Sequence, residues 1–257
     1  MRKINYFGIE VTDASLEEIV EWCVVQIRQR RTIHLVTLNP DQFLRFEHDR
    51  LYHAIYHHAD LVFVDGIGII LSSLLLKERF QHRVAGADLM EALCSRAAKE
   101  HFSVFLFGAL PQVNKRAQKI LESRYPELQI VGGDSAIVSE EGDMIDDVQP
   151  IEKISALKPD ILFVALGTPK QEKWIAKYRA EMDVHCLFGV GATFDFISGY
   201  QKRAPLWLQR IGLEWLFRLL HEPRRLWKRY LIGIPSFIIF VIKLKLFSRN
   251  DGWHGLK

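Results

Sequence analysis

Short apolar segments alternate with amphipathic ones over most of the chain. The apolar segments are rich in β-branched and aromatic residues and end at Gly, Asn or Asp, a pattern typical of strands buried on both faces of a parallel sheet. They lie at 33–38, 61–64, 104–107, 128–131, 161–166 and 186–190. The segments between them have the spacing of helices with one apolar face. They lie at 16–30, 42–57, 88–99, 112–125 and 171–182. This alternation predicts an α/β fold with a doubly wound, mainly parallel sheet.

The character of the chain changes after Asp195. A helical pattern covers 204–220 and is broken by Pro223. We therefore predict two parts, an α/β core at 1–198 and a helical appendage at 199–257.

The appendage is basic first and apolar afterwards. Residues 224–230 are strongly basic and 231–242 are almost wholly apolar. The apolar part is shorter than the roughly 20 residues that cross a bilayer. With Trp227 and Tyr230 beside basic residues, it is typical of an anchor in the membrane interface. A helix buried at a contact between subunits is the alternative.

Charge and cysteine content limit the class of partner. The net charge of +3 is too small to indicate a nucleic-acid partner, and the excess is gathered at 202–229. The cysteines Cys23, Cys94 and Cys186 have no metal-type spacing, so we expect buried thiols in a reduced compartment. The N-terminus leads into Glu10 rather than an apolar signal segment, which favours a cytoplasmic protein.

Candidate chemistry lies where the predicted strands end, since open α/β sheets bind ligands beyond the carboxyl ends of their strands. Asp65 directly follows the second strand, in a position suited to a general base; its alternative role is to cap the next helix. Asn39 precedes Pro40 and is either a ligand contact or an Asx-turn residue. Gln171 lies just inside a helix start, where it either contacts a ligand or is solvated.

The sequence lacks the motifs that several other classes of enzyme require. The sequence has no P-loop, no G-x-S-x-G elbow and no D-x-D triplet, and Gly189-Val190-Gly191 lacks a third glycine at the dinucleotide-binding spacing. The acidic stretch 140–147 is interpreted as a solvated loop rather than a metal site, so no metal is predicted. A diphosphate leaving group would then need cationic side chains. The appendage offers several, whose alternative partner is anionic lipid: Arg203, Arg218, Arg224, Arg225, Lys228 and Arg229.

Ordered blocks of sequence join these positions to a known family. The blocks are TLNP at 37–40, VDG at 64–66, RVAGADL at 83–89, GTPKQE at 167–172, GVGATFD at 189–195, KRAP at 202–205 and GLEWLFRL at 212–219. With them, the chain resembles the WecG/TagA/CpsF glycosyltransferases (glycosyltransferase family 26) over nearly its full length. The resemblance implies a Rossmann-like core, a membrane-targeting C-terminal appendage, and an inverting hexosyltransferase that needs neither metal nor cofactor.

The resemblance also implies substrates and partners. The donor would be a UDP-sugar carrying N-acetylmannosamine, its uronic acid or glucose, and the acceptor a sugar on undecaprenyl diphosphate. The product would enter cell-surface polysaccharide or teichoic acid synthesis. We accordingly expect a homo-oligomer that is peripheral on the inner face of the cell membrane, with the appendage acting as a mobile lid.

Roles for single residues follow from the same resemblance. Asp65 is the expected general base. The residues expected to line the sugar and acceptor site are Thr37, Asn39, Arg83, Gln171 and Asp195. Those expected to hold the donor diphosphate are Arg203, Arg218, Arg225 and a further basic residue, Arg229 or Lys228.

Two alternatives of another class use the same residues. One is a nucleotide-sugar-binding protein without turnover. The other is a hydrolase or epimerase of soluble sugar nucleotides, against which the basic and apolar C-terminus weighs, because a soluble substrate needs no membrane anchor.

Overall fold

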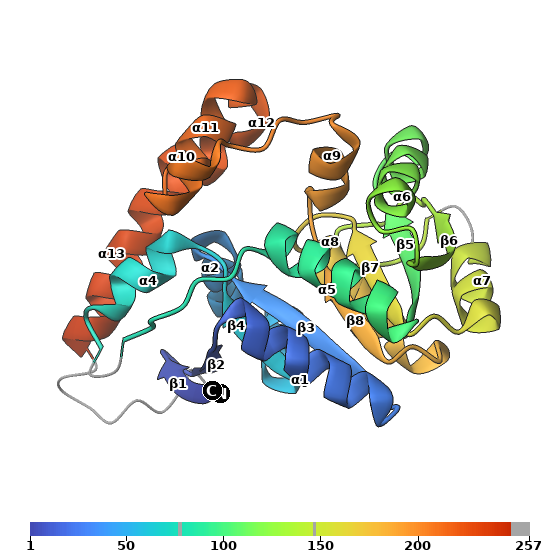
Figure 1. Cartoon of the computed structure of the whole chain (residues 1–257). Coiled ribbons are helices and arrows are strands. Elements are labelled where there is room, and N and C mark those ends of the chain that lie inside the picture. The colour runs from blue at the N-terminus through green and yellow to red at the C-terminus, as the bar shows by residue number, and fades with distance from the viewer. Residues whose placement is uncertain (77–78, 146–147, 248–257) are drawn as a thin grey trace.

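A single mixed sheet forms the centre of the molecule (Figure 1). The computed structural model describes residues 1–76, 79–145 and 148–247, and in these residues eight strands pair in the order β1-β2-β4-β3-β8-β7-β5-β6. Their bounds are β1 (Arg2–Tyr6), β2 (Ile9–Asp13), β3 (Ile33–Leu38), β4 (Leu61–Val64), β5 (Ser103–Gly108), β6 (Gln129–Asp134), β7 (Ile161–Ala165) and β8 (Cys186–Gly189). The six strands predicted from apolar segments are confirmed, with small shifts at their ends.

The strands that the sequence analysis missed form an antiparallel hairpin at one edge. β1 and β2 pair from Arg2 opposite Asp13 to Tyr6 opposite Ile9, and β2 joins the parallel sheet through Thr12 opposite Phe63. β1 alternates buried and exposed residues rather than forming an apolar run. That is the pattern of a strand with one solvated face.

Helices cover both faces of the sheet, which confirms the doubly wound fold (Figure 1). One face carries helices α1 (Leu16–Arg28), α5 (Gly86–Glu100), α6 (Pro111–Arg124) and α9 (Thr193–Ser198). The other carries α2 (Pro40–His48), α3 (Arg50–His58), α4 (Ile67–Ser73), α7 (Gln149–Leu157) and α8 (Lys170–Tyr178).

Two helices predicted as continuous are each divided. The segment 42–57 becomes α2 and α3 because Asp49 is extended between them and caps α3, accepting from the N–H of Tyr52 at 3.1 Å. The segment 204–220 is divided at Gly212, whose φ of +76° is in the left-handed region that favours glycine.

The appendage follows α9, which ends at Gly199. It contains α10 (Leu206–Arg210), α11 (Glu214–His221), α12 (Pro223–Trp227), a π-helical turn (Lys228–Ile232) and α13 (Gly233–Phe247). These helices form the orange and red arm in Figure 1. Residues 248–257 of the predicted appendage lie outside the described residues.

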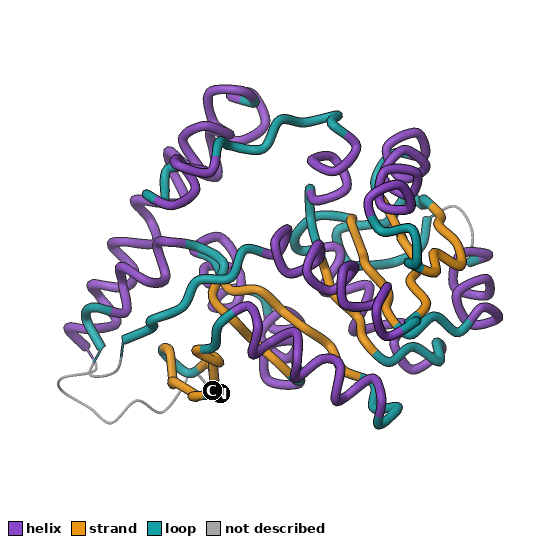
Figure 2. Tube along the Cα trace, viewed as in Figure 1, coloured by secondary structure: helices purple, strands orange, loops and turns teal. Residues whose placement is uncertain are grey.

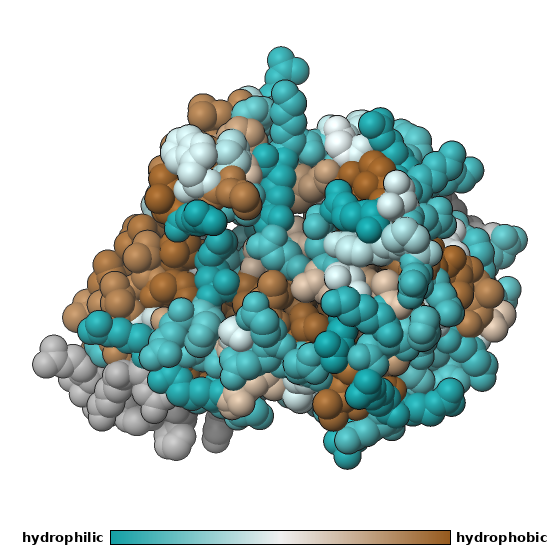
Figure 3. All heavy atoms as spheres, viewed as in Figure 1, coloured by the Kyte–Doolittle hydropathy of each residue, from teal (hydrophilic) through white to brown (hydrophobic). Residues whose placement is uncertain are grey.

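One face of α13 packs onto the core. Figure 2 shows this helix alongside α4, and it also contacts α2. Phe237 and Val241 are only 2% exposed, and the ring of Phe237 meets that of Phe43 edge-on at 5.8 Å between centroids. The opposite face leaves Ile239 exposed, and Figure 3 shows a hydrophobic surface over this arm. Within the described residues, α13 and the other helices all fall short of what is needed to cross a membrane.

Candidate active site

A cavity of about 790 Å³ lies at the carboxyl ends of β3, β4 and β8, and the appendage forms its opposite wall. This is where an open α/β sheet binds ligands. Nine of the ten predicted site residues line it: Thr37, Asn39, Asp65, Arg83, Gln171, Arg203, Arg218, Arg225 and Arg229.

Asp65 is held at the end of β4 by backbone contacts. Its N–H donates to the carbonyl of Leu38 at 3.0 Å. The following residue has to be glycine, because a Cβ on Gly66 would lie 2.8 Å from Cδ of Pro40. Gly66 occupies the N-cap position of α4 and the helix has no side-chain cap, so the alternative role of Asp65 as the cap is wrong. Its carboxyl group is left to face the cavity.

The surroundings of Asp65 make it a better base than an ordinary aspartate. Its pKa is raised from 3.8 to about 6, first by burial and second by the negative charge of Glu214. The positive charges of Arg83, Arg218 and Arg229 act in the opposite direction. A carboxyl group with a pKa near 6 is ionised at neutral pH yet basic enough to accept a proton during a reaction.

Arg83 joins this carboxyl-bearing loop to the appendage. Its Nη1 donates to the backbone carbonyl of Asp65 at 3.4 Å, and its Nη2 donates to the carbonyl of Gln209, at 3.2 Å. One guanidinium therefore fixes the position of α10 relative to Asp65.

A buried polar network forms the floor of the cavity. The amide nitrogen of Gln42 donates to Oγ1 of Thr37 at 3.0 Å and to Oε1 of Glu172 at 3.2 Å. Gln171 also donates to Oε1 of Glu172, at 2.9 Å, and accepts the N–H of Gly191 at 2.9 Å. Gln171 is thus a buried, bonded residue rather than a solvated one.

The central member of this network was not predicted. Glu172 is 2% exposed, burial raises its pKa, and its Oε2 has no hydrogen-bond partner among the described residues. Glu172 belongs to the block at 167–172, which was the one signal for it in the sequence. Its contact with Gln42 joins segments that are distant in the chain and so could not be predicted.

The side chain of Asn39 bonds locally, whereas its expected contact with a ligand stays a prediction. Its side-chain oxygen accepts the N–H of Gln42 at 3.1 Å and so caps α2. The residue also lines the cavity.

The appendage arginines offer unused donors. Nε of Arg218 and both Nε and Nη2 of Arg203 are buried and make no hydrogen bond within the described part of the chain. Arg203 is anchored by Nη1, which donates to Asp88 at 2.6 Å, and Arg225 by Nε, which donates to Glu222 at 2.6 Å. Buried guanidinium groups with free N–H groups suit phosphate oxygens.

Arg229 and Lys228, the alternatives for the further diphosphate ligand, differ in their position relative to the cavity. Arg229 lines the cavity, with Nε 3.9 Å from a carboxylate oxygen of Asp41. Lys228 is absent from the lining and holds its ammonium group 5.6 Å from the ring centre of Trp227. Arg224 does not line the cavity either.

Asp195 lies outside the lining of the cavity. Burial raises the pKa of its carboxyl group, while the charges of Arg225 and Arg218 lower it. Asp195 therefore lies near two arginines of the cavity, and its expected contact with a sugar stays a prediction.

Two aromatic residues of the lining were read differently from the sequence. From the sequence, Trp215 belongs to the helical pattern at 204–220 and to the block at 212–219, and Tyr230 to the expected membrane interface, without a role in the site. Both line the cavity, with ring centres 5.8 Å apart.

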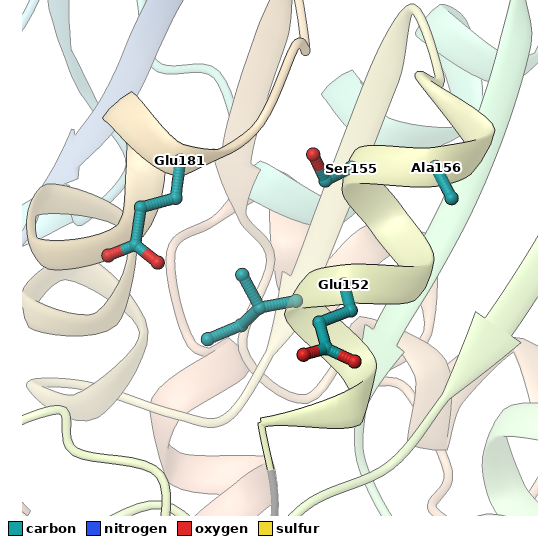
Figure 4. Close-up of a pocket in the computed structure, with 5 residues that line it drawn as sticks. Glu152, Ser155, Ala156 and Glu181 are labelled. Atoms are coloured by element: carbon teal, nitrogen blue, oxygen red, sulfur yellow. The ribbon is translucent and has the colours of Figure 1, made fainter.

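Acidic clusters elsewhere do not form a comparable site. A hollow of about 400 Å³ beside α7 is lined by Glu152, Ser155, Ala156, Glu181 and Ile151, none of which has a cationic side chain (Figure 4). In the predicted acidic loop, Glu141 pairs with Lys173 at 2.8 Å and Asp143 pairs with Lys177. Residues 146–147 of that loop lie outside the described residues. In the ranges that the structure describes, no three His, Cys, Asp or Glu side chains gather as a metal site.

Comparisons with known proteins find relatives of a single family. The model of the glycosyl transferase WecG/TagA/CpsF family matches residues 4–251. An N-acetylglucosaminyldiphosphoundecaprenol N-acetyl-beta-D-mannosaminyltransferase of Bacillus subtilis (strain 168) is 36% identical over 207 residues, covering 80% of this chain and 78% of the relative. The protein of the same name from Bacillus spizizenii is 33% identical over 248 residues, covering 96% and 93%. The one from Staphylococcus aureus (strain MRSA252) is 29% identical over 247 residues, covering 95% and 93%.

Proposed function

The chain belongs to the WecG/TagA/CpsF family of glycosyl transferases, and from this premise we propose that it transfers N-acetylmannosamine from UDP to N-acetylglucosaminyl-diphosphoundecaprenol. The names of the three relatives supply the transferred sugar and the lipid-linked acceptor. The UDP donor rests on the resemblance and on the cationic half of the cavity. The product enters synthesis of a cell-surface polymer.

One observation carries the proposal: Asp65, with its raised pKa, shares a single cavity with the arginines of the appendage. A base and a set of diphosphate ligands are the two elements that a metal-independent sugar transfer requires. Neither alternative, a binding protein without turnover or a hydrolase of soluble sugar nucleotides, accounts for both elements together with an apolar arm.

The reaction is a single displacement with inversion. The acceptor hydroxyl attacks the anomeric carbon from the face opposite UDP, and its proton passes to the carboxylate of Asp65. The bond between the anomeric carbon and the diphosphate oxygen breaks, and its electron pair leaves with UDP. Arg218, Arg225 and Arg229 stabilise the negative charge that develops there.

Membrane contact belongs to the same proposal. The exposed face of the arm carries Leu231 and Ile239, which are 60% and 55% exposed, close to basic residues of α12 and the π-helical turn. Apolar side chains beside cations are typical of a peripheral membrane surface. We propose that this arm rests on the inner face of the membrane and that the protein assembles as a homo-oligomer. Sedimentation with anionic vesicles tests the first point, and absence of binding would contradict it.

The decisive experiment measures UDP release from a panel of UDP-sugars, with and without a synthetic N-acetylglucosaminyl-diphospholipid, in the presence of EDTA. We expect release from UDP-N-acetylmannosamine that requires the acceptor and survives EDTA. UDP release with the uronic acid or the glucose donor instead would identify that sugar, rather than N-acetylmannosamine, as the one transferred. Release without acceptor would identify a hydrolase, and loss of release in EDTA would contradict metal independence.

A further inference from the structure

The cavity that contains Asp65 continues into an apolar groove between α4 and α13. Leu71, Leu74 and Leu75 form one side, in α4 and the turn after it. Ile234, Phe237, Ile238, Val241 and Ile242 form the other side, on α13. We call this part the α4–α13 groove.

The groove has a buried floor and exposed walls. Phe237 and Val241 form the floor and are each 2% exposed. Leu71 and Ile238, on opposite walls, are 58% and 50% exposed. Side chains of this kind around a hollow mark a surface that an apolar partner covers.

Charge is segregated along the cavity. None of the lining residues from α4, the turn after it and α13 is charged in the described structure, whereas Arg225 and Arg229 line the cavity just before α13 begins. The cavity therefore has a cationic part beside Asp65 and an uncharged apolar part. This matches a ligand with a diphosphate attached to a hydrocarbon chain.

We infer that the α4–α13 groove binds the first isoprene units of the acceptor lipid. The inference rests on the proposed function, because that function supplies an acceptor with a polyprenyl chain attached to its diphosphate. Chain binding in the groove would bring the lipid diphosphate next to the arginines that stabilise the departing UDP, and would present the terminal sugar to Asp65. The groove would thus select acceptors by their lipid chain as well as by their sugar.

Two adjacent residues separate this role from general membrane contact. Ile238 lines the groove, whereas Ile239 does not, although both are apolar and about half exposed, at 50% and 55%. Ile238→Glu places a charge in the proposed chain site, and Ile239→Glu places the same charge on the outer face. Leu74→Glu tests the opposite wall.

The first measurement is calorimetric binding of inorganic diphosphate, geranyl diphosphate and farnesyl diphosphate to the full chain, without vesicles or detergent. We expect affinity to rise by at least about threefold for each added isoprene unit. Full burial of one methylene is worth a factor of about four, so this lower limit requires only part of each unit to be buried. Ile238→Glu and Leu74→Glu should abolish this rise while Ile239→Glu retains it. Circular dichroism and melting curves establish that each variant is folded.

Two outcomes overturn the inference. One is equal affinity of the unchanged protein for inorganic and farnesyl diphosphate. The other is equal loss of the chain-length effect in Ile238→Glu and Ile239→Glu, which would assign it to a general apolar surface. Because binding needs no turnover, its failure is distinguishable from failure of the proposed transfer. Binding that depends on chain length, without sugar transfer, would support the lipid groove and contradict the proposed transferase. Sugar transfer without chain-length-dependent binding would support the transferase and contradict the groove.

Discussion

Arg83 and Gln209 connect the core to the appendage across the candidate active site. Nη2 of Arg83 donates to the carbonyl of Gln209 at 3.2 Å, while Nη1 of the same guanidinium contacts the carbonyl of Asp65. The placement of the appendage is therefore coupled to the loop that carries the proposed base. Should the appendage act as the lid expected from the resemblance, this contact would couple its closure to assembly of the site.

Removing this connection should impair catalysis more than stability. Arg83→Met keeps the length of the side chain but loses both hydrogen bonds and a positive charge near Asp65. We expect kcat/KM to fall about 10- to 100-fold, in line with about 1.5–3 kcal/mol for hydrogen bonds of a charged group. Arg124→Met, which removes a surface pair with Glu91 away from the cavity, is the control, and equal activity of the two variants would contradict the prediction.

Asp65→Asn should abolish transfer while leaving the fold intact. The unchanged enzyme should lose kcat/KM as the pH falls below about 6, because protonated Asp65 accepts no proton. General bases contribute about 100- to 10,000-fold, so a comparable fall in kcat is expected for the variant. A variant that retains a tenth of the activity would exclude Asp65 as the base.

The same substitution should stabilise the protein above pH 6. Because the pKa of Asp65 is raised on folding, its carboxylate destabilises the native state, and the free energy of unfolding decreases as the pH rises from 3.8 to about 6. Asparagine lacks this charge. We expect Asp65→Asn to be more stable at pH 7 by about 1 to 2 kcal/mol, since one pKa unit is about 1.4 kcal/mol and solvent screens part of it. Denaturant unfolding at pH 4 and pH 7 measures the difference.

Glu214 offers a way to move the pH profile without touching the base. Its negative charge raises the pKa of Asp65, so Glu214→Gln should lower that pKa and shift the acidic limb of kcat/KM to lower pH. Arg83→Met should shift the same limb to higher pH, because it removes an opposing positive charge. The pH dependence of kcat/KM measures both, and a shift in the same direction for the two variants would contradict this account.

The neighbouring residues Arg224 and Arg225 provide a matched test of diphosphate binding. Arg225 lines the cavity and Arg224 does not, although both lie in the short helix α12. We expect Arg225→Ala to reduce kcat/KM for the UDP-sugar about 10- to 100-fold, as for loss of a charged hydrogen bond. Arg224→Ala should stay within about twofold in a detergent-solubilised assay. Similar losses in both variants would point to a general charge effect.

Local pattern was enough to predict much of this fold. A strand buried on both faces is apolar at nearly every position, so β4 and β7 are visible as apolar runs and β3 as a run interrupted by His34 and Thr37. Asp65 was identifiable because it directly follows such a run. The order of the strands and the β1–β2 hairpin could not be identified from the sequence. Strand pairing depends on contacts between segments, which leave no local pattern in either one.

The α/β class, the family, and the residue types available for base and diphosphate contacts follow from the sequence alone, because short stretches of the chain carry each of them. How these residues act together depends on the tertiary structure. It raised the pKa of Asp65 by burying it beside Glu214, moved Asp195 out of the cavity lining, and placed Glu172 under the site. It also brought α4 against α13 to form one groove. These relationships join residues far apart in the chain, and their energies depend on distance and burial, which exist only once the chain has folded.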